Sequence, residues 1–389
     1  MKKLLLPLFA ILFLNNVNAQ WASQVAPNPT NNLYSVFAIS PMNVAAAGFT
    51  GLIRTTTGGA TWTQQVTLGG VNMYELHSPN WPKWYALTQN NSWFLKMGIS
   101  STTLQGGKPD SILSLHFMNP ACGIAVGTAG KIEATCDTGA TWQLRTSGTT
   151  ANLNAIWFAD KDSGCTVGNI GVIKRTKDAG NTWTNIASGT GTGLNGIHFP
   201  TASIGFIVGN GGKVLKTMDA GLTWTSVPTG TLSNLNAVFF IDKDTGYVGG
   251  ASGLIMKTIT GGTTWTVMAT GTSQTINSIH FTTPMEGWAV GNAGTILKYT
   301  GGAITTGIAT IATKAQFDFF PNPVGNELTV RSTVKNSILK VHNTVGEIVY
   351  ETVLDNEEMN LNVSSLKPGV YFMEFTDGDN IVVKKFVKE

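Results

Sequence analysis

The sequence predicts an all-β protein: a seven-bladed β-propeller followed by a small immunoglobulin-like β-sandwich. The main observation is a repeat, because Trp142, Trp183, Trp224 and Trp265 follow one another at intervals of 41 residues. A period near 40 with several short strands per unit is the signature of a propeller. Composition agrees, since 45 of the 389 residues are glycine and only 12% are charged, which suits strands joined by tight turns.

Residues 1–19 have the pattern of a signal peptide. Lys2 and Lys3 precede an apolar run over residues 4–14, which is too short to span a membrane comfortably. Residues 17–19, Val-Asn-Ala, form a small-residue cleavage site, so we expect export and a mature chain that starts at Gln20. A retained anchor is the alternative. We expect no transmembrane segment in the mature chain.

Alignment on the tryptophans gives four strands in each unit. The first strand covers residues 153–158, with counterparts at 194–199, 235–240 and 276–281. The second ends in Val-Gly and leads into a Gly-x-x-Gly turn, whose glycines suit a tight hairpin with positive φ. The third strand, such as 172–176, leads through a second turn to a fourth strand that starts at the tryptophan.

The turn before each tryptophan resembles the Asp-box of bacterial neuraminidase repeats, Ser/Thr-x-Asp-x-Gly-x-Thr-Trp. Residues 135–142, 176–183 and 217–224 are complete copies, whereas Thr57 and Thr260 replace the aspartate in two others. A short carboxylate can accept N–H bonds inside its own turn, and tryptophan packs between strands. The resemblance implies a structural role, away from the ligand face, for Asp137, Asp178, Asp219, Trp62, Trp142, Trp183, Trp224 and Trp265.

Seven units begin near residues 33, 73, 113, 153, 194, 235 and 276, so the propeller should span residues 20–303. The second unit, 71–110, is degenerate and has lost its Asp-box. The last unit stops at Gly301-Gly302 without its fourth strand, and residues 21–25 resemble residues 62–66. We therefore expect the N-terminal strand to complete the last blade, which closes the ring and removes open sheet edges.

Residues 304–316 form a linker, and residues 317–389 form a second domain of alternating apolar strands and turns. The run Phe320-Pro-Asn-Pro323 and the later Leu366-Lys-Pro-Gly-Val-Tyr371 stand in the order and spacing of the type A C-terminal sorting domain of the type IX secretion system, which this tail resembles. The resemblance implies contact with that secretion machinery through residues 317–389. It also implies passage from the periplasm across the outer membrane, with release or surface attachment. An ordinary immunoglobulin-like module is the alternative.

Export places the three cysteines in an oxidising compartment. Cys122 and Cys136 are equidistant from the turn at 127–130, so they can face each other across a hairpin. The spacing leaves both a disulfide and two free thiols open. With a disulfide there, Cys165 would be left free and buried.

Binding residues are predicted most clearly in the degenerate second blade. It concentrates aromatic side chains beside Asn90 and Asn91, which suits stacking on a sugar ring, although core filling is the alternative. Trp84 and Tyr85 are adjacent, so on a strand they point to opposite faces. The candidate ligand-binding residues are Trp81, Trp84, Trp93 and His77.

A second candidate is a cationic series just before the Asp-box. It is interrupted by Ala134 and consists of Arg54, Arg175, Lys216, Lys257 and Lys298. It predicts either an anion-binding ring or a strand edge whose long stems cover apolar surface.

Cofactors and metals are not expected. His116, His198 and His280 share one position on the first strand, where other blades carry an aromatic residue, so packing is favoured. Metal ligands so far apart round a ring would not converge within bonds of about 2 Å. A net charge of +3 does not suggest nucleic acid as a partner.

Hydrolase chemistry is disfavoured. The turns and links expected on the ligand face carry Ser, Thr, Asn and Gly. A sialidase needs three arginines around a carboxylate, whereas the propeller holds only Arg54, Arg145 and Arg175. The nearest carboxylate pairs for a glycosidase lie in the Asp-Lys-Asp turns at 160–162 and 242–244, which we interpret as turn formers.

The propeller also resembles the photosystem II assembly-factor-like group of neuraminidase-repeat propellers, on the repeat rather than on any site. The resemblance implies a binding or assembly role. We expect a secreted or cell-surface, non-catalytic propeller that binds a protein or a polysaccharide. The alternatives are a glycoside hydrolase or sialidase-like enzyme and a surface structural or adhesion protein.

Overall fold

The computed structural model describes residues 21–49, 51–67, 72–80, 83–88, 94–97, 102–105, 112–299, 317–332, 337–343, 347–376 and 381–389. The chain divides into two compact units, Met1–Ile304 and Thr305–Glu389. Within the described residues, no helix has the length and apolarity that a membrane crossing would need. The expected signal peptide and linker lie outside these residues.

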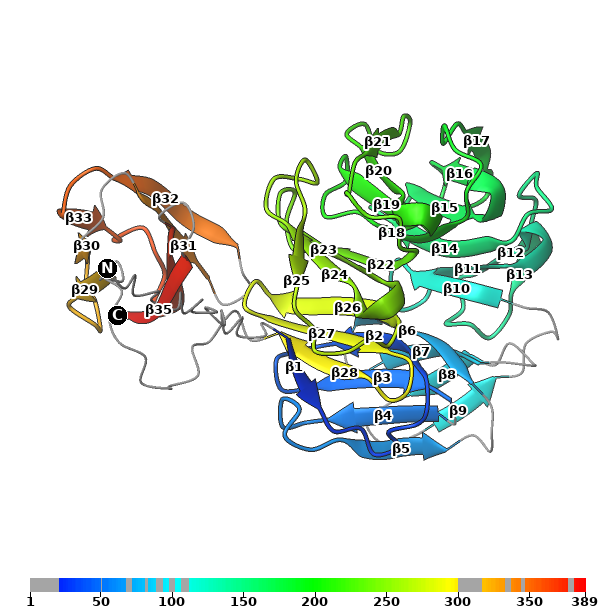
Figure 1. The fold of residues 1–389 in the computed structure, drawn as a ribbon, viewed down its shortest axis with the longest axis horizontal. Coiled ribbons are helices and arrows are strands. Elements are labelled where there is room, and N and C mark those ends of the chain that lie inside the picture. The colour runs from blue at the N-terminus through cyan, green and yellow to red at the C-terminus, as the bar shows by residue number, and fades with distance from the viewer. Residues whose placement is uncertain are drawn as a thin grey trace, which may run out of the picture. The chain divides into compact units, whose positions relative to one another are not determined.

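The described part of the first unit contains seven four-stranded antiparallel sheets, the blades of a propeller (Figure 1). Blade 1 contains β2 (Leu33–Ala38), β3 (Val44–Gly48), β4 (Gly51–Thr55) and β5 (Thr63–Thr67). Blade 2 contains β6 (Met73–Asn80), β7 (Lys83–Thr88), β8 (Phe94–Met97) and β9 (Thr102–Gln105). Blade 3 contains β10 (Ile112–Phe117), β11 (Gly123–Gly127), β12 (Ile132–Thr135) and β13 (Gln143–Arg145). Blade 4 contains β14 (Leu153–Phe158), β15 (Gly164–Gly168), β16 (Ile173–Thr176) and β17 (Thr184–Ile186).

The remaining blades repeat this plan. Blade 5 contains β18 (Leu194–His198), β19 (Gly205–Gly209), β20 (Val214–Thr217) and β21 (Thr225–Val227). Blade 6 contains β22 (Leu235–Phe240), β23 (Gly246–Gly250), β24 (Ile255–Thr258) and β25 (Thr266–Met268). Blade 7 contains β26 (Ile276–Thr283), β27 (Glu286–Gly291), β28 (Ile296–Tyr299) and β1 (Trp21–Gln24). The all-β, seven-bladed prediction is confirmed.

The N-terminal strand completes the last blade, as the sequence predicts. β1 pairs antiparallel with β28, from Trp21 opposite Tyr299 to Gln24 opposite Ile296 (Figure 1). The first strands of consecutive blades contact each other around the ring, and β26 contacts β2. The two ends of the propeller are therefore joined by a sheet ladder, which leaves no broken blade at the seam.

The turns between second and third strands need positive φ, as their glycines predict. Four of them form short 3-10 segments: η1 (Thr128–Gly130), η2 (Asn169–Gly171), η3 (Asn210–Gly212) and η4 (Ala251–Gly253). In the first, φ is 52° at Ala129 and 71° at Gly130. A Cβ at Gly130 would lie 1.9 Å from the carbonyl oxygen of Thr149, so glycine is required there for space as well as conformation.

The core lies mainly between blades. In blades 1, 3, 4, 5 and 6, the tryptophan just before the outer strand packs against the preceding blade. Trp224 of blade 5, for example, joins a cluster with Cys165, Val167 and Ile173 of blade 4. Its ring also meets Phe199 edge-on at 5.8 Å between centroids. The repeating tryptophan therefore holds one unit against the previous one, which explains why it recurs with the period of the fold.

The second unit is a two-sheet sandwich. One sheet contains β29 (Phe317–Phe320), β30 (Glu327–Ser332) and β33 (Glu358–Asn362). The other contains β31 (Ser337–His342), β32 (Ile348–Leu354), β34 (Gly369–Thr376) and β35 (Ile381–Lys388). Both sheets contribute to one core, for example Val330 and Leu361 from the first and Val341, Met373 and Phe386 from the second.

Candidate functional site

Side chains on the first strands join neighbouring blades. The amide of Asn154 donates to the carbonyl of Leu194 at 2.9 Å, and Asn195 donates in the same way to Leu235. Asn277 of blade 7 closes the series on Leu33 of blade 1, at 2.8 Å. Because these inner strands share no sheet ladder, such contacts satisfy backbone groups that strand edges would otherwise leave unpaired.

The fifth residue of the first strand of each blade contributes to a closed ring of seven side chains. It unites the three histidines of the sequence series with the aromatic residues of the other blades. Neighbouring centroids are 4.4–6.0 Å apart all round the ring. The members, in order, are Phe37, His77, His116, Trp157, His198, Phe239 and His280.

Hydrogen bonds fix the imidazoles of this ring. Nδ1 of His198 accepts the N–H of Phe240 in the next blade at 3.3 Å, and Nδ1 of His280 accepts the N–H of Ala38 at 3.4 Å. Burial lowers the pKa of His77 and of His280 to about 4 and that of His198 to about 3. The imidazoles are therefore neutral at physiological pH and act as packing and hydrogen-bonding groups. Among the described residues no cluster suited to a metal ion is found.

His77 occupies a different place from the one its neighbours suggested. Its place in the sequence groups it with the blade 2 tryptophans, whereas in the structure it belongs to the ring of seven side chains. Its Nε2 lies 3.0 Å from the carbonyl oxygen of Phe117, and its ring lies 4.6 Å from that of His116. Alignment of residue 73 with residue 153 already put His77 at the position of Trp157, so the signal was present.

Glu75 is a residue that sequence reasoning missed. It is largely buried on β6, at a position where Ser35, Ser114 and Ser278 stand in other blades. Oε2 of Glu75 accepts the N–H of Leu115 at 2.7 Å, and Oε1 accepts the hydroxyl of Ser114 at 3.3 Å. Burial raises the pKa of Glu75 to about 8. The carboxyl group is therefore largely protonated at neutral pH and serves as one more inter-blade link.

Carboxylates in the turns before the outer strands are engaged locally. Asp178 accepts the N–H of Thr182 at 2.9 Å, the hydroxyl of Thr182 at 2.6 Å and the hydroxyl of Thr176 at 2.8 Å. Asp137 and Asp219 make the corresponding bonds. The hydrogen bonds to the threonine at the end of the turn lower the pKa of Asp178, so its carboxylate holds the turn in its ionised form.

The first aspartate of each Asp-Lys-Asp turn likewise accepts hydrogen bonds within its own turn. Oδ1 of Asp160 accepts the N–H groups of Asp162 and Ser163 at 2.8 and 2.6 Å. Asp242 accepts those of Asp244 and Thr245 at 2.8 and 2.7 Å. These bonds agree with their interpretation as turn formers.

Most side chains of the cationic series contact the next blade. Nε of Arg175 donates to the carbonyl of Ala220 at 2.7 Å, and Nζ of Lys298 donates to that of Gly58 at 2.9 Å. Lys257 instead lies over the rings of Tyr247 and Tyr299. Arg54 donates to Asn43 at 3.1 Å. These contacts support the structural alternative for the series, and the anion-binding ring stays a prediction.

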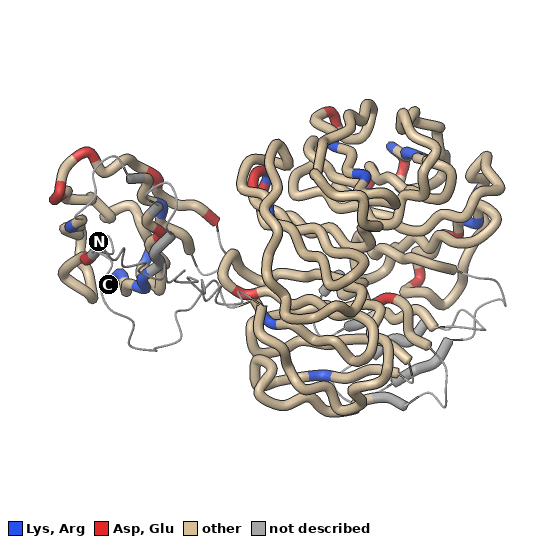
Figure 2. The backbone as a smooth tube through the Cα atoms, in the orientation of Figure 1, with Lys and Arg blue, Asp and Glu red and all other residues tan. Residues whose placement is uncertain are grey.

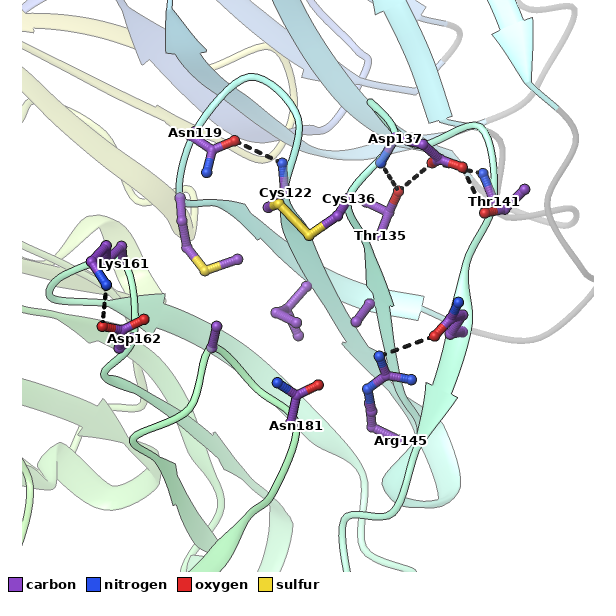
Figure 3. Close-up of a pocket in the computed structure, with 15 residues that line it drawn as sticks. Asn119, Cys122, Thr135, Cys136, Asp137, Thr141, Arg145, Lys161, Asp162 and Asn181 are labelled. Carbon is purple, nitrogen blue, oxygen red and sulfur yellow. Dashed lines mark hydrogen bonds and ion pairs between the residues drawn. A yellow bond between two sulfur atoms is a disulfide. The ribbon is translucent and has the colours of Figure 1, made fainter.

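A pocket of about 510 Å³ opens where the series is interrupted (Figure 3). It lies between blades 3 and 4. Charged residues are sparse over most of the propeller, as Figure 2 shows. Figure 3 shows Asp162 and Arg145 on opposite sides of this pocket. Ala134 and Ala179 are also part of its wall.

The disulfide left open by the sequence is present in the wall of this pocket. Cys122 and Cys136 are bonded, which ties together two turns of blade 3 (Figure 3). Cys165 is free and buried.

Most of the predicted blade 2 site lies outside the described residues. Trp81 and Trp93 lie outside the described residues. The backbone of Trp84 lies on β7 opposite Met97, but its side chain is outside the described set. These three tryptophans stay predictions.

Two family models match parts of the chain. Residues 318–389 match the model described as a secretion system C-terminal sorting domain. Residues 102–191 match the model described as photosynthesis system II assembly factor YCF48. No curated protein matches the sequence.

Solved structures share the fold. A structure described as YCF48 bound to D1 peptide has a TM-score of 0.62 at 16% identity, covering 72% of this chain and 95% of its own. YCF48 from Cyanidioschyzon merolae has a TM-score of 0.59 at 18% identity, covering 72% and 98%. PorZ, described as an essential bacterial surface component of the type-IX secretion system of Porphyromonas gingivalis, has a TM-score of 0.51 at 11% identity, covering 90% and 58%.

These findings confirm the resemblances stated from the sequence, namely a YCF48-like propeller fold with a C-terminal sorting domain of the type IX system. The sorting domain indicates export through the periplasm to the cell surface or the extracellular space, and contact with the secretion machinery.

Proposed function

We propose that this protein is a non-catalytic propeller, released or held at the cell surface, that binds an extracellular protein or polysaccharide. The observation that carries the proposal is how the described propeller uses its carboxyl groups. Asp160 and Asp178 hold their own turns, and Glu75 links two blades. Groups committed in this way stabilise the scaffold and are poorly placed to act as a general acid or base on a substrate.

One face of the propeller suits binding without chemistry. It is built from the turns between second and third strands and the links between blades. Exposed apolar side chains stand among its Ser, Thr, Asn and Gly residues: Ile170 is 71% exposed and Leu232 is 89% exposed. Neutral hydrogen-bonding groups with scattered apolar contacts fit a protein surface or sugar hydroxyls.

The proposal keeps the roles predicted from the sequence. Trp81, Trp84 and Trp93 are kept as candidate stacking residues for a sugar ring. The turns before the outer strands are Asp-boxes with a structural role. The structure described as YCF48 bound to D1 peptide shows a similar fold with a peptide ligand, which supports a protein partner for the present chain as well.

The test is capture by the purified protein on a glycan array, on insoluble polysaccharides and from extracellular protein fractions, with product analysis on every glycan hit. Binding without cleavage, lost in Trp84→Ala or Trp93→Ala, would support a carbohydrate ligand at blade 2. Binding to a protein alone would support the protein partner. Cleavage would overturn the non-catalytic role in favour of a glycoside hydrolase, and self-association without any ligand would favour a structural or adhesion protein.

A further inference from the structure

The interface between blades 5 and 6 shows how the cationic position is normally filled. Nζ of Lys216 donates to the carbonyl of Gly261 at 2.7 Å, and it lies 5.4 Å from the centroid of Phe206. A Cβ built on Gly261 would lie 2.9 Å from this nitrogen and 3.5 Å from Oδ1 of Asp244. The ammonium group is therefore held by a carbonyl oxygen, while the carboxylate of Asp244 forms its ion pair with Lys243.

Blades 3 and 4 lack the cation at this position. Ala134 pairs with Ile124 in the same register in which Lys216 pairs with Phe206. A methyl group therefore stands where the long stem and ammonium of lysine would begin.

The backbone carbonyl that accepts the cation in blade 6 nevertheless has a counterpart in blade 4. The N–H of Ala179 donates to the carbonyl of Asp162 at 2.9 Å, as that of Gly261 donates to Asp244 at 2.8 Å. Both acidic residues end an Asp-Lys-Asp turn, and each forms an ion pair with the lysine before it. Asp162 also lines the pocket, so its negative charge favours a cation that enters.

The pocket is the space that the missing side chain would occupy. Its wall includes Ala134, Ala179 and Asp162, together with the apolar side chains of Met118 and Ile124 (Figure 3). Apolar walls suit the methylene stem of a long side chain, and the carbonyl and carboxylate suit its charged end.

We propose that this pocket binds one lysine or arginine side chain of an extracellular protein partner. The cationic group donates to the carbonyl oxygen of Ala179, as Lys216 donates to that of Gly261 between blades 5 and 6. The carboxylate of Asp162 in the pocket wall adds electrostatic attraction. Arg145 and Lys161, which also line the pocket, repel further cations, so the pocket selects a single basic residue over a polycation. This inference rests on the proposed binding function and specifies its partner chemistry.

The test uses the full chain and the peptide acetyl-Gly-Lys-Gly-amide, with norleucine in place of lysine as the neutral control. The methyl NMR signals of Ala134 and Ala179 report on the pocket. We expect saturable shifts with the lysine peptide and none with the norleucine peptide. Asp162→Asn should weaken binding about tenfold, since a negative charge in the pocket wall is lost. Asp244→Asn is the matched control and should leave the shifts unchanged.

Two further variants should fill this pocket or create a second one elsewhere. Ala134→Lys should fill the pocket from within and abolish the shifts. Lys216→Ala should open a second pocket, reported by the methyl signal of the new alanine on addition of the lysine peptide. Equal shifts with norleucine, or full binding by Ala134→Lys, would overturn the inference.

The outcome is distinguishable from failure of the proposed function. Capture of a protein partner without any shift at Ala134 and Ala179 would disprove the pocket and leave the binding function standing. Shifts without capture of any protein or polysaccharide would support the pocket and contradict the wider proposal.

Discussion

Trp21 pairs with Tyr299, with their ring centroids 5.2 Å apart, so residues from opposite ends of the propeller share one blade. Trp21 is 1% exposed and also meets Tyr247 of blade 6. The seam of the ring is therefore closed by a sheet ladder and by a buried aromatic cluster.

Trp21→Ala should lower the free energy of unfolding by about 3–5 kcal/mol, because a large buried ring is lost at the seam. Chemical denaturation followed by tryptophan fluorescence measures the change. Ser23→Ala, on the same strand but exposed, should have almost no effect. A loss below about 1 kcal/mol for Trp21→Ala would contradict a stabilising closure.

Asp178→Ala should lower the free energy of unfolding by about 1 kcal/mol, since several hydrogen bonds inside one exposed turn are lost. Neighbouring Lys177, whose side chain is exposed, supplies the control Lys177→Ala. Any ligand bound on the opposite face should be retained with unchanged affinity. A ligand lost in Asp178→Ala with the fold intact would argue for a binding role of this turn.

The buried histidines in the ring of seven side chains should make the folded protein less stable in mild acid. His198 has a pKa of about 3 in the folded protein, below the usual 6.5, so the folded state prefers the neutral imidazole. The resulting contribution is complete above pH 6.5 and is lost as the pH falls from 6.5 towards 3. Denaturation midpoints measured between pH 7 and pH 4.5 should fall, and less steeply in His198→Phe, which copies Phe239. An unchanged slope in that variant would contradict the assignment.

Glu75 predicts the opposite dependence. Its folded pKa of about 8 lies above the usual 4.5, so its contribution is complete below pH 4.5 and is lost as the pH rises towards 8. Glu75→Gln keeps an acceptor for the N–H of Leu115 without a titrating charge. Its stability relative to the parent protein should therefore rise between pH 5.5 and pH 8.5. A constant difference across this range would show that Glu75 does not titrate there.

The disulfide between Cys122 and Cys136 spans 14 residues. In the chain-entropy picture, a loop of this length contributes about 3 kcal/mol to stability. The double variant Cys122→Ser/Cys136→Ser should lose an amount of that order, measured by denaturation without reductant. Reductant should destabilise the parent protein and leave the double variant unaffected.

The blade plan could be predicted in detail because it is local and repeated. The unit starts inferred at residues 33, 153, 194, 235 and 276 coincide with the first residues of β2, β14, β18, β22 and β26. Hydrogen bonds inside a turn, such as those of Asp178, join residues only a few positions apart, so a motif reveals them.

Contacts between blades were much less visible. Lys216 and Gly261 lie 45 residues apart in different blades, and no local sequence pattern indicates that they form a hydrogen bond. Glu75 did leave a signal, since it is an acid where other blades carry small residues, but only the fold shows that it meets Leu115.

The sequence by itself determined the number of blades, the closing strand and the sorting tail, since each follows from repeated or ordered patterns along the chain. The tertiary structure alone decided which side chains meet across the blades: the ring that includes His77, and the pocket left by Ala134. The physical reason is that such contacts depend on the distance and angle between neighbouring sheets, which packing sets and no single repeat encodes.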